Sequence, residues 1–179
     1  MKTLSLLLAL ITLPATAQDW KMDAGKSQIG FAIRQMNVPT EGGFKRFATK
    51  AHFDPARPET GRFQIEVDVN SIDTGSDEGD SEVKRPAWFD AARHPKATFV
   101  STRLRKEANG SYTALGDLTI KGQTRAFAAP FSLVRQTGGG FLAQGRFPLK
   151  RSDFGIGAGD WDEVVANEAD IRFKIILLP

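Results

Sequence analysis

The sequence predicts an all-β domain, an antiparallel sandwich or barrel of about eight short strands. Apolar residues recur at every second position along most of the chain, which is the period of a half-buried strand and not of a helix. Turn signals such as Asn109-Gly110 and Gly138-Gly139-Gly140 separate the alternating segments at short intervals. Only one long stretch, residues 76–92, departs from this alternation.

Each alternating segment has one apolar face, and these segments are the expected strands. Their apolar residues, in chain order, are Ile29, Phe31 and Ile33; Phe63, Ile65, Val67 and Val69; Ala97 and Phe99; Leu118 and Ile120; Phe127, Ala129, Phe131 and Leu133; Phe141, Ala143, Phe147 and Leu149; and Ile171, Phe173, Ile175 and Leu177. Because successive side chains of a strand point to opposite faces, their polar neighbours should point outward. These outward residues are Arg34, Glu66, Asp68, Lys121 and Lys174.

Helices are expected in two short regions. Ser76 and the acidic residues after it resemble a helix start, and Pro86 divides the stretch, so residues 76–92 should form one or two short helices beside the strands. Trp88 and Phe89 are expected on this helical stretch. A single helical turn is also expected over residues 38–44.

The first residues have the three parts of a secretory signal peptide. Lys2 provides a charged start, residues 4–13 form an apolar run, and Ala15-Thr16-Ala17 is a small-x-small cleavage site. The run is well short of the roughly 20 apolar residues that a spanning helix needs. We therefore expect a cleaved signal peptide at residues 1–17 and a single domain at residues 18–179, located in the bacterial cell envelope.

Composition excludes several classes of function. With 24 Lys and Arg against 21 Asp and Glu, the net charge of +3 gives no reason to expect a nucleic-acid partner. The chain has no Cys, which removes disulfides, thiol nucleophiles and Cys-based zinc sites. It has only two His, which form no known metal-binding pattern. No metal and no cofactor are expected.

One motif resembles a catalytic loop. Residues 72–76 read Ile-Asp-Thr-Gly-Ser, like the active-site loop of an aspartic protease, in which two carboxylates share a proton. The chain has one copy, so only a symmetric homodimer could assemble the pair from two Asp73 side chains. The favoured alternative is that Asp73 and Thr74 end a strand and cap the following helix. No catalytic residue is expected, and a dimeric hydrolase remains a remote alternative.

Phenylalanine is unusually frequent, with 13 Phe against one Tyr, and most of the Phe residues fall on the inward phase of the strands. A closed barrel of about eight strands is either filled by side chains or holds one apolar ligand, and composition does not separate the two. Trp88 and Phe89 are expected beside the mouth as a lid. The residues expected to face the interior are Phe31, Ile33, Phe53, Ile65, Val67, Phe99, Leu118, Ile120, Phe131, Phe147 and Phe173.

Six strings, in this order and spacing, resemble the YceI-like family of periplasmic polyisoprenoid-binding proteins. They cover nearly the whole chain after the signal peptide. The strings are residues 20–23 with 27–31 (WKMD, SQIGF), 43–47 with 53–55 (GFKRF, FDP), 69–75 (VNSIDTG), 88–91 with 94–101 (WFDA, HPKATFVS), 116–122 (GDLTIKG) and 151–157 (RSDFGIG).

The resemblance implies an eight-stranded antiparallel lipocalin-like barrel, with a helix beside or over it, that holds a polyisoprenoid or other long-chain amphiphile in the periplasm. It implies binding without catalysis, since the family has the same Ile-Asp-Thr-Gly turn without protease activity. An alternative is an accessory module that handles isoprenoid quinones for a membrane cytochrome. The sequence departs from the family at residues 80–83, where many members have Asp, His and Leu, so a head-group contact at that place does not carry over.

Overall fold

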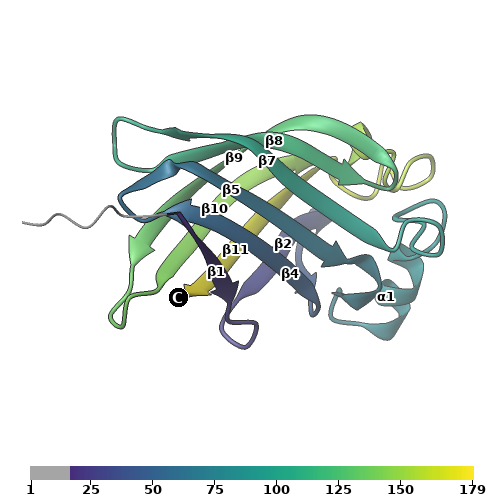
Figure 1. The fold of residues 1–179 in the computed structure, drawn as a ribbon. Helices are drawn as coiled ribbons and strands as arrows, with labels where there is room; N and C mark the ends of the chain where they lie inside the picture. The colour runs from purple at the N-terminus through teal and green to yellow at the C-terminus, as the bar shows by residue number, and fades with distance from the viewer. Residues whose placement is uncertain (1–16) are drawn as a thin grey trace, which may run out of the picture.

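The computed structural model describes residues 17–179, which form an antiparallel barrel with one short helix at one end (Figure 1). The signal-peptide prediction falls almost entirely on residues 1–16, outside the described part. The strands are β1 (Gln18–Met22), β2 (Gln28–Gln35), β3 (Val38–Phe44), β4 (Phe47–Asp54), β5 (Arg57–Asp68), β6 (Ile72–Asp73), β7 (Lys96–Lys106), β8 (Tyr112–Ile120), β9 (Gln123–Arg135), β10 (Phe141–Lys150) and β11 (Glu168–Leu178). The helix is α1 (Asp77–Val83), and 3-10 turns span Val69–Ser71 and Arg151–Phe154.

Strand β1 closes the barrel. It pairs with β4 on one side and with the end of β11 on the other, while the remaining strands follow in the order β4, β5, β7, β8, β9, β10, β11. The result is a closed eight-stranded antiparallel barrel, so the expected fold class is confirmed. Nearer to α1, β11 pairs with β2 instead of β1, and β3 pairs with the other edge of β2.

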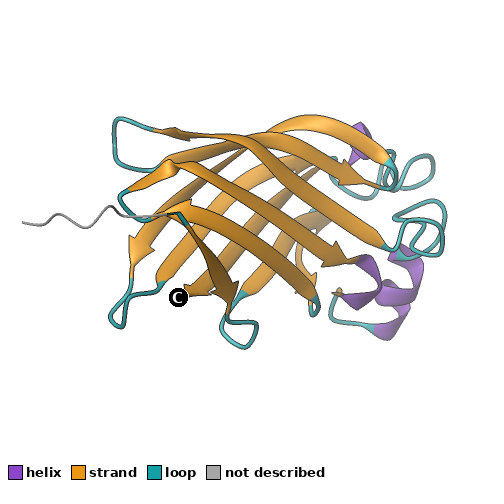
Figure 2. Cartoon of the chain, in the orientation of Figure 1, coloured by secondary structure: helices purple, strands orange, loops and turns teal. Residues whose placement is uncertain are grey.

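The short helix expected within residues 76–92 is present as α1, but two details were wrong. Residues 38–44 are strand β3 and not a helical turn, because Met36 and Asn37, both with positive φ, make a two-residue hairpin that pairs Gln35 with Val38. Helix α1 ends at Val83, and the chain continues as turns through Trp88 and Phe89. Figure 2 shows the helical segments gathered at this end of the barrel. Pro86 disfavours helical backbone at the residue before it, which is consistent with this early end.

The two ends of the barrel are closed by different side chains. At the end where the termini lie, the Trp20 ring stacks on Phe53 at a centroid distance of 5.0 Å and meets Phe141 edge-on at 4.9 Å. At the α1 end, five buried residues form a second cluster, which we call the plug. The plug consists of Trp88, Ile120, Phe154, Ile156 and Val165.

Arg151 holds the segment that carries the plug. The residue is 4% exposed, and its guanidinium donates hydrogen bonds to five backbone carbonyls. The acceptors are the carbonyls of Ile156, Gly157, Trp161, Val165 and Ala166. A buried charge is tolerated only when its donors are satisfied in this way, so Arg151 fixes the path of residues 151–167 across the barrel end.

Lys121 binds the segment that carries the plug, contrary to the expectation that it points outward from a strand. It lies with Gly122 in the β8–β9 turn, where both residues have positive φ, and its Nζ donates to the Gly155 carbonyl at 2.6 Å. Partial burial lowers the pKa of this ammonium group. The other four residues expected outward are exposed or half-buried in the outward phase, and Glu66 pairs there with Lys96.

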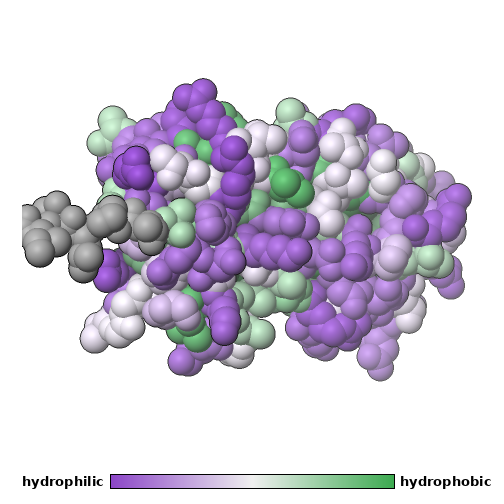
Figure 3. Space-filling view, viewed as in Figure 1, coloured by the Kyte–Doolittle hydropathy of each residue, from purple (hydrophilic) through white to green (hydrophobic). Residues whose placement is uncertain are grey.

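The outer surface is mostly hydrophilic on the face that Figure 3 shows, with small apolar patches between polar side chains. This is the pattern that strands with one inward apolar face produce. Within residues 17–179 no helix has the length and apolar character needed to cross a bilayer.

Candidate functional site in the barrel lumen

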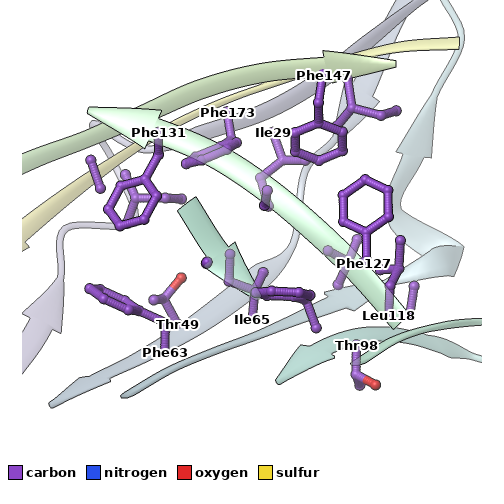
Figure 4. A pocket seen from close by; sticks show the side chains of 18 of the residues that line it. Ile29, Thr49, Phe63, Ile65, Thr98, Leu118, Phe127, Phe131, Phe147 and Phe173 are labelled. Atoms are coloured by element: carbon purple, nitrogen blue, oxygen red, sulfur yellow. The ribbon is translucent and has the colours of Figure 1, made fainter. Parts of the chain in front are cut away.

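The middle of the barrel is an apolar cavity of about 150 Å3 between the two closed ends. Figure 4 shows aromatic and aliphatic side chains from opposite walls pointing into it. Several of the lining side chains are only partly buried although they face inward, so the lumen is incompletely filled. The lining residues are Ile29, Thr49, Phe63, Ile65, Val67, Ala97, Thr98, Phe99, Ala114, Leu118, Phe127, Ala129, Phe131, Ala143, Phe147, Ile171, Phe173, Ile175 and Leu177.

Polar groups are scarce in the cavity, and among the described residues no charged side chain lines it. Thr98 pairs with Glu66 and Thr119 in the outward phase, so its hydroxyl does not face the lumen. Thr49 pairs with Ile65 in the inward phase, and its buried Oγ1 has no hydrogen-bond partner among the described residues. A buried hydroxyl without a partner costs about 1–3 kcal/mol. The lumen therefore suits a hydrocarbon chain, and the Thr49 hydroxyl is available for one polar group of a ligand.

Seven of the residues expected in the lumen line the cavity. They are Ile65, Val67, Phe99, Leu118, Phe131, Phe147 and Phe173.

The other four, together with Trp88 and Phe89 of the expected lid, lie at the barrel ends. Phe53 belongs to the cluster near the termini, Ile120 and Trp88 belong to the plug, and Ile33 packs against the plug. The rings of Phe31 and Phe89 both contact Phe44, with centroid distances of 6.0 and 6.4 Å.

Sequence reasoning did not select several residues that line the cavity. The larger ones are Ile29, Phe63, Phe127, Ile171, Ile175 and Leu177. Each is in the same alternation phase as a residue that was selected on its own strand, so the signal was present in the pattern. What the pattern does not contain is the height of each residue along the barrel axis.

The cavity is small for a long lipid. An engineered protein cavity of about 150 Å3 lined by Leu, Ile and Phe holds one benzene molecule. A chain of many carbons must therefore displace lining side chains or extend beyond the cavity. Phe127 and Phe147 are suited to moving because both are partly exposed, and their rings meet edge-on at 4.9 Å (Figure 4).

Strands β9 and β10 separate beside this ring pair. Their ladder runs from Arg135 and Phe141 to Ser132 and Gln144, and beyond this point β9 pairs with β8 and β10 pairs with β11. A surface groove of about 350 Å3 lies in the resulting seam. The groove is lined by Arg125, Ala126, Phe127, Pro148, Leu149, Lys150, Asp153, Phe154 and Glu168.

Asp73 lies outside the barrel, at its α1 end. Its carboxylate accepts hydrogen bonds from Lys45 Nζ at 2.7 Å and from the Gly75 N–H at 3.0 Å, and these contacts lower its pKa. The capping expectation was wrong in detail, because Ser76 caps α1 by accepting from the Gly79 N–H at 3.1 Å. An aspartic dyad needs one carboxyl that keeps its proton, so this ion-paired carboxylate is poorly suited to that chemistry.

Comparison with known proteins agrees with this architecture. A model of the YceI-like domain matches residues 20–177. A UPF0312 protein of Vibrio cholerae is 32% identical over 162 residues, covering 84% of this chain and 85% of its own. The crystal structure of Burkholderia cenocepacia BcnA has a TM-score of 0.83 and 37% identity, covering 87% of this chain and 99% of that one. A polyisoprenoid binding domain from Saccharophagus degradans, implicated in plant cell wall breakdown, has a TM-score of 0.67 and 16% identity, covering 89% of this chain and 97% of its own.

Proposed function

This chain belongs to the YceI-like family, and on that basis we propose that it binds a polyisoprenoid or another long-chain amphiphilic lipid in the barrel lumen, without catalysing a reaction. The observation that carries the proposal is an incompletely filled cavity lined by apolar side chains from strands all around the barrel. The name of the Saccharophagus degradans domain, a polyisoprenoid binding domain with the same fold, supports this ligand class.

Apolar burial alone supplies enough energy for the proposed binding. At about 25 cal/mol per Å2, burying about 400 Å2 of a hydrocarbon chain contributes about 10 kcal/mol before the costs of ordering. The remainder is compatible with micromolar or tighter affinity and requires no ion pair. The ligand-contacting residues proposed are the seven expected ones that line the cavity, together with Ile29, Phe63 and Phe127.

We place the protein in the periplasm, as a mature chain that starts at Gln18. The support for this location is the signal-peptide pattern of residues 1–17 and the family match. N-terminal sequencing of protein recovered from a periplasmic extract checks it. A start at Met1 in that fraction would contradict the proposed cleavage.

The alternative functions differ in what they predict. A dimeric hydrolase needs a raised pKa on one Asp73, whereas the contacts with Lys45 and Gly75 lower it. An accessory module for isoprenoid quinones would use the same lumen, so it differs in the bound molecule and in having a membrane cytochrome as partner. Organic extraction of the purified protein, followed by mass spectrometry, separates polyprenol from quinone.

All-trans-retinol, a fluorescent isoprenoid alcohol, provides a direct test. We expect native mass spectrometry and retinol fluorescence to show a one-to-one complex. Ile65→Trp, which places an indole in the lumen, should weaken this binding about tenfold or more. Gln64→Trp, at the neighbouring outward position of β5, is the matched control and should bind retinol like wild type. Equal binding by all three proteins would show that the lumen is not the site.

A further inference from the structure

We propose that the groove between β9 and β10 is a lateral portal to the lumen and holds the neutral polar head of the bound amphiphile, with the Phe127–Phe147 ring pair as its gate. This inference rests on the proposed function. Its basis is that the two spaces are adjacent, because Phe127 lines both the lumen and the groove.

The β9–β10 ladder is interrupted at the seam because each of the two strands contains a proline there. Continuing the β9–β10 register would place Pro130 opposite Arg146 and Pro148 opposite Ala128. Neither proline has an N–H to donate, so the ladder cannot extend through these positions. From there β9 stays paired with β8 and β10 stays paired with β11, so the seam between them has no strand pairing.

The two ends of the barrel are less suited to ligand entry than the seam between β9 and β10. Trp20, Phe53 and Phe141 pack against one another at one end, and the plug is fixed by the five carbonyl bonds of Arg151 at the other. At the seam, the Phe127 and Phe147 rings are both partly exposed, and we propose that their rotation lets the ligand pass. Side-chain rotation is far faster than the loss of a packed cluster or of a buried hydrogen-bond network.

The groove has an apolar floor and a polar rim. Phe127, Leu149 and Phe154 provide the apolar part. The charges at the rim, Arg125 and Lys150 against Asp153 and Glu168, cancel formally. Arg125 donates to neutral oxygens, namely the Asp153 carbonyl and the Gln123 side chain. A balanced rim with hydrogen-bonding groups suits an alcohol or a carbonyl head, and gives an anionic head no net attraction.

Stopped-flow measurement of retinol uptake, followed by the emission of retinol itself, tests the portal. Ala126→Trp places an indole in the groove, and we expect it to slow both association and release about tenfold. Val100→Trp is the matched control, because Val100 is an exposed outward residue of β7, which β8 separates from the strands of the seam. Phe127→Ala removes the gate, and both rates should rise about tenfold.

The outcomes separate the two proposals. If retinol fails to bind the wild-type protein, the proposed function fails. If retinol binds but Ala126→Trp and Phe127→Ala exchange it at the wild-type rate, the portal is wrong. A slower exchange in Ala48→Trp alone would place access at β4, which pairs with β1 only at residues 51–53, and would also overturn the proposal.

Retinoic acid tests the head-group class. We expect the wild-type protein to bind it more weakly than retinol, and Glu168→Gln to improve retinoic acid binding while leaving retinol unchanged. Wild-type affinity about tenfold higher for the carboxylate than for the alcohol would refute the neutral head.

Discussion

Ile65→Trp should make the ligand-free protein more stable while it blocks binding. Ile65 lies on β5 with its side chain in the cavity, half-buried and beside Thr49 and Phe99. An unfilled cavity of about 150 Å3 costs about 3.6 kcal/mol at about 24 cal/mol per Å3. An indole that fills about half of this volume recovers about 2 kcal/mol, which raises the Tm by about 4–8 °C in a domain of this size.

Differential scanning calorimetry of delipidated wild type, Ile65→Trp and Gln64→Trp measures this shift, and retinol titration of the same samples measures binding. Gln64→Trp should change neither quantity. Overpacking of a filled core costs about 1–3 kcal/mol, so a packed lumen predicts a lower Tm. A lower Tm for Ile65→Trp together with unchanged retinol affinity would refute the idea of an open, ligand-sized lumen.

Three further predictions concern residues outside the lumen. Arg151→Met should lower the free energy of unfolding by about 3 kcal/mol or more, because five carbonyls lose their donor, and Arg151→Lys should restore only part of it in urea titrations. Hydrogen bonds from Arg146 and Arg172 lower the pKa of Asp170, and those from Thr74 lower that of Asp80. Their contribution to stability is present above the ordinary value of 3.8 and is lost as pH falls through the lower folded values, so unfolding free energy measured from about pH 5 to pH 2 should fall less steeply in Asp170→Asn. Asp73→Asn should produce no change in any hydrolytic background and only a small change in stability, since the ion pair with Lys45 is exposed; a hydrolysis rate that disappears with this substitution would support the dimeric hydrolase.

The sequence was sufficient for the barrel and for the inward phase of its strands, because alternation directly encodes which face is buried. Its failures occur where the pattern is weak. Strand β4 was not anticipated because its inward positions include Thr49 and Ala51, which give little apolar contrast. Strand β3 has Pro39, Thr40, Glu41, Gly42 and Gly43 at its centre, and it exists because of the Met36-Asn37 hairpin.

The position of a residue along the barrel axis could not be read from the sequence. Ile33 and Ile65 are both inward isoleucines on alternating strands, yet one packs against the plug and the other lines the cavity. The difference arises from residues 151–167, which cross one end because Arg151 is buried. Arginine is seldom fully buried, so sequence alone gives no reason to expect this anchor.

Different parts of this barrel serve folding and the proposed binding: the ends are packed, and the middle is incompletely filled. Close contacts hold its two ends, in the Trp20–Phe53–Phe141 cluster and in the hydrogen bonds of Arg151, and none of these residues lines the cavity. The middle can therefore be underfilled at a cost of a few kcal/mol without loss of the fold. Since no charge among the described residues lines the cavity, selection among ligands there depends on chain shape and on the single hydroxyl of Thr49. Discrimination between polar heads must then occur outside the cavity, where charged side chains first become available, and the groove beside Phe127 is such a place.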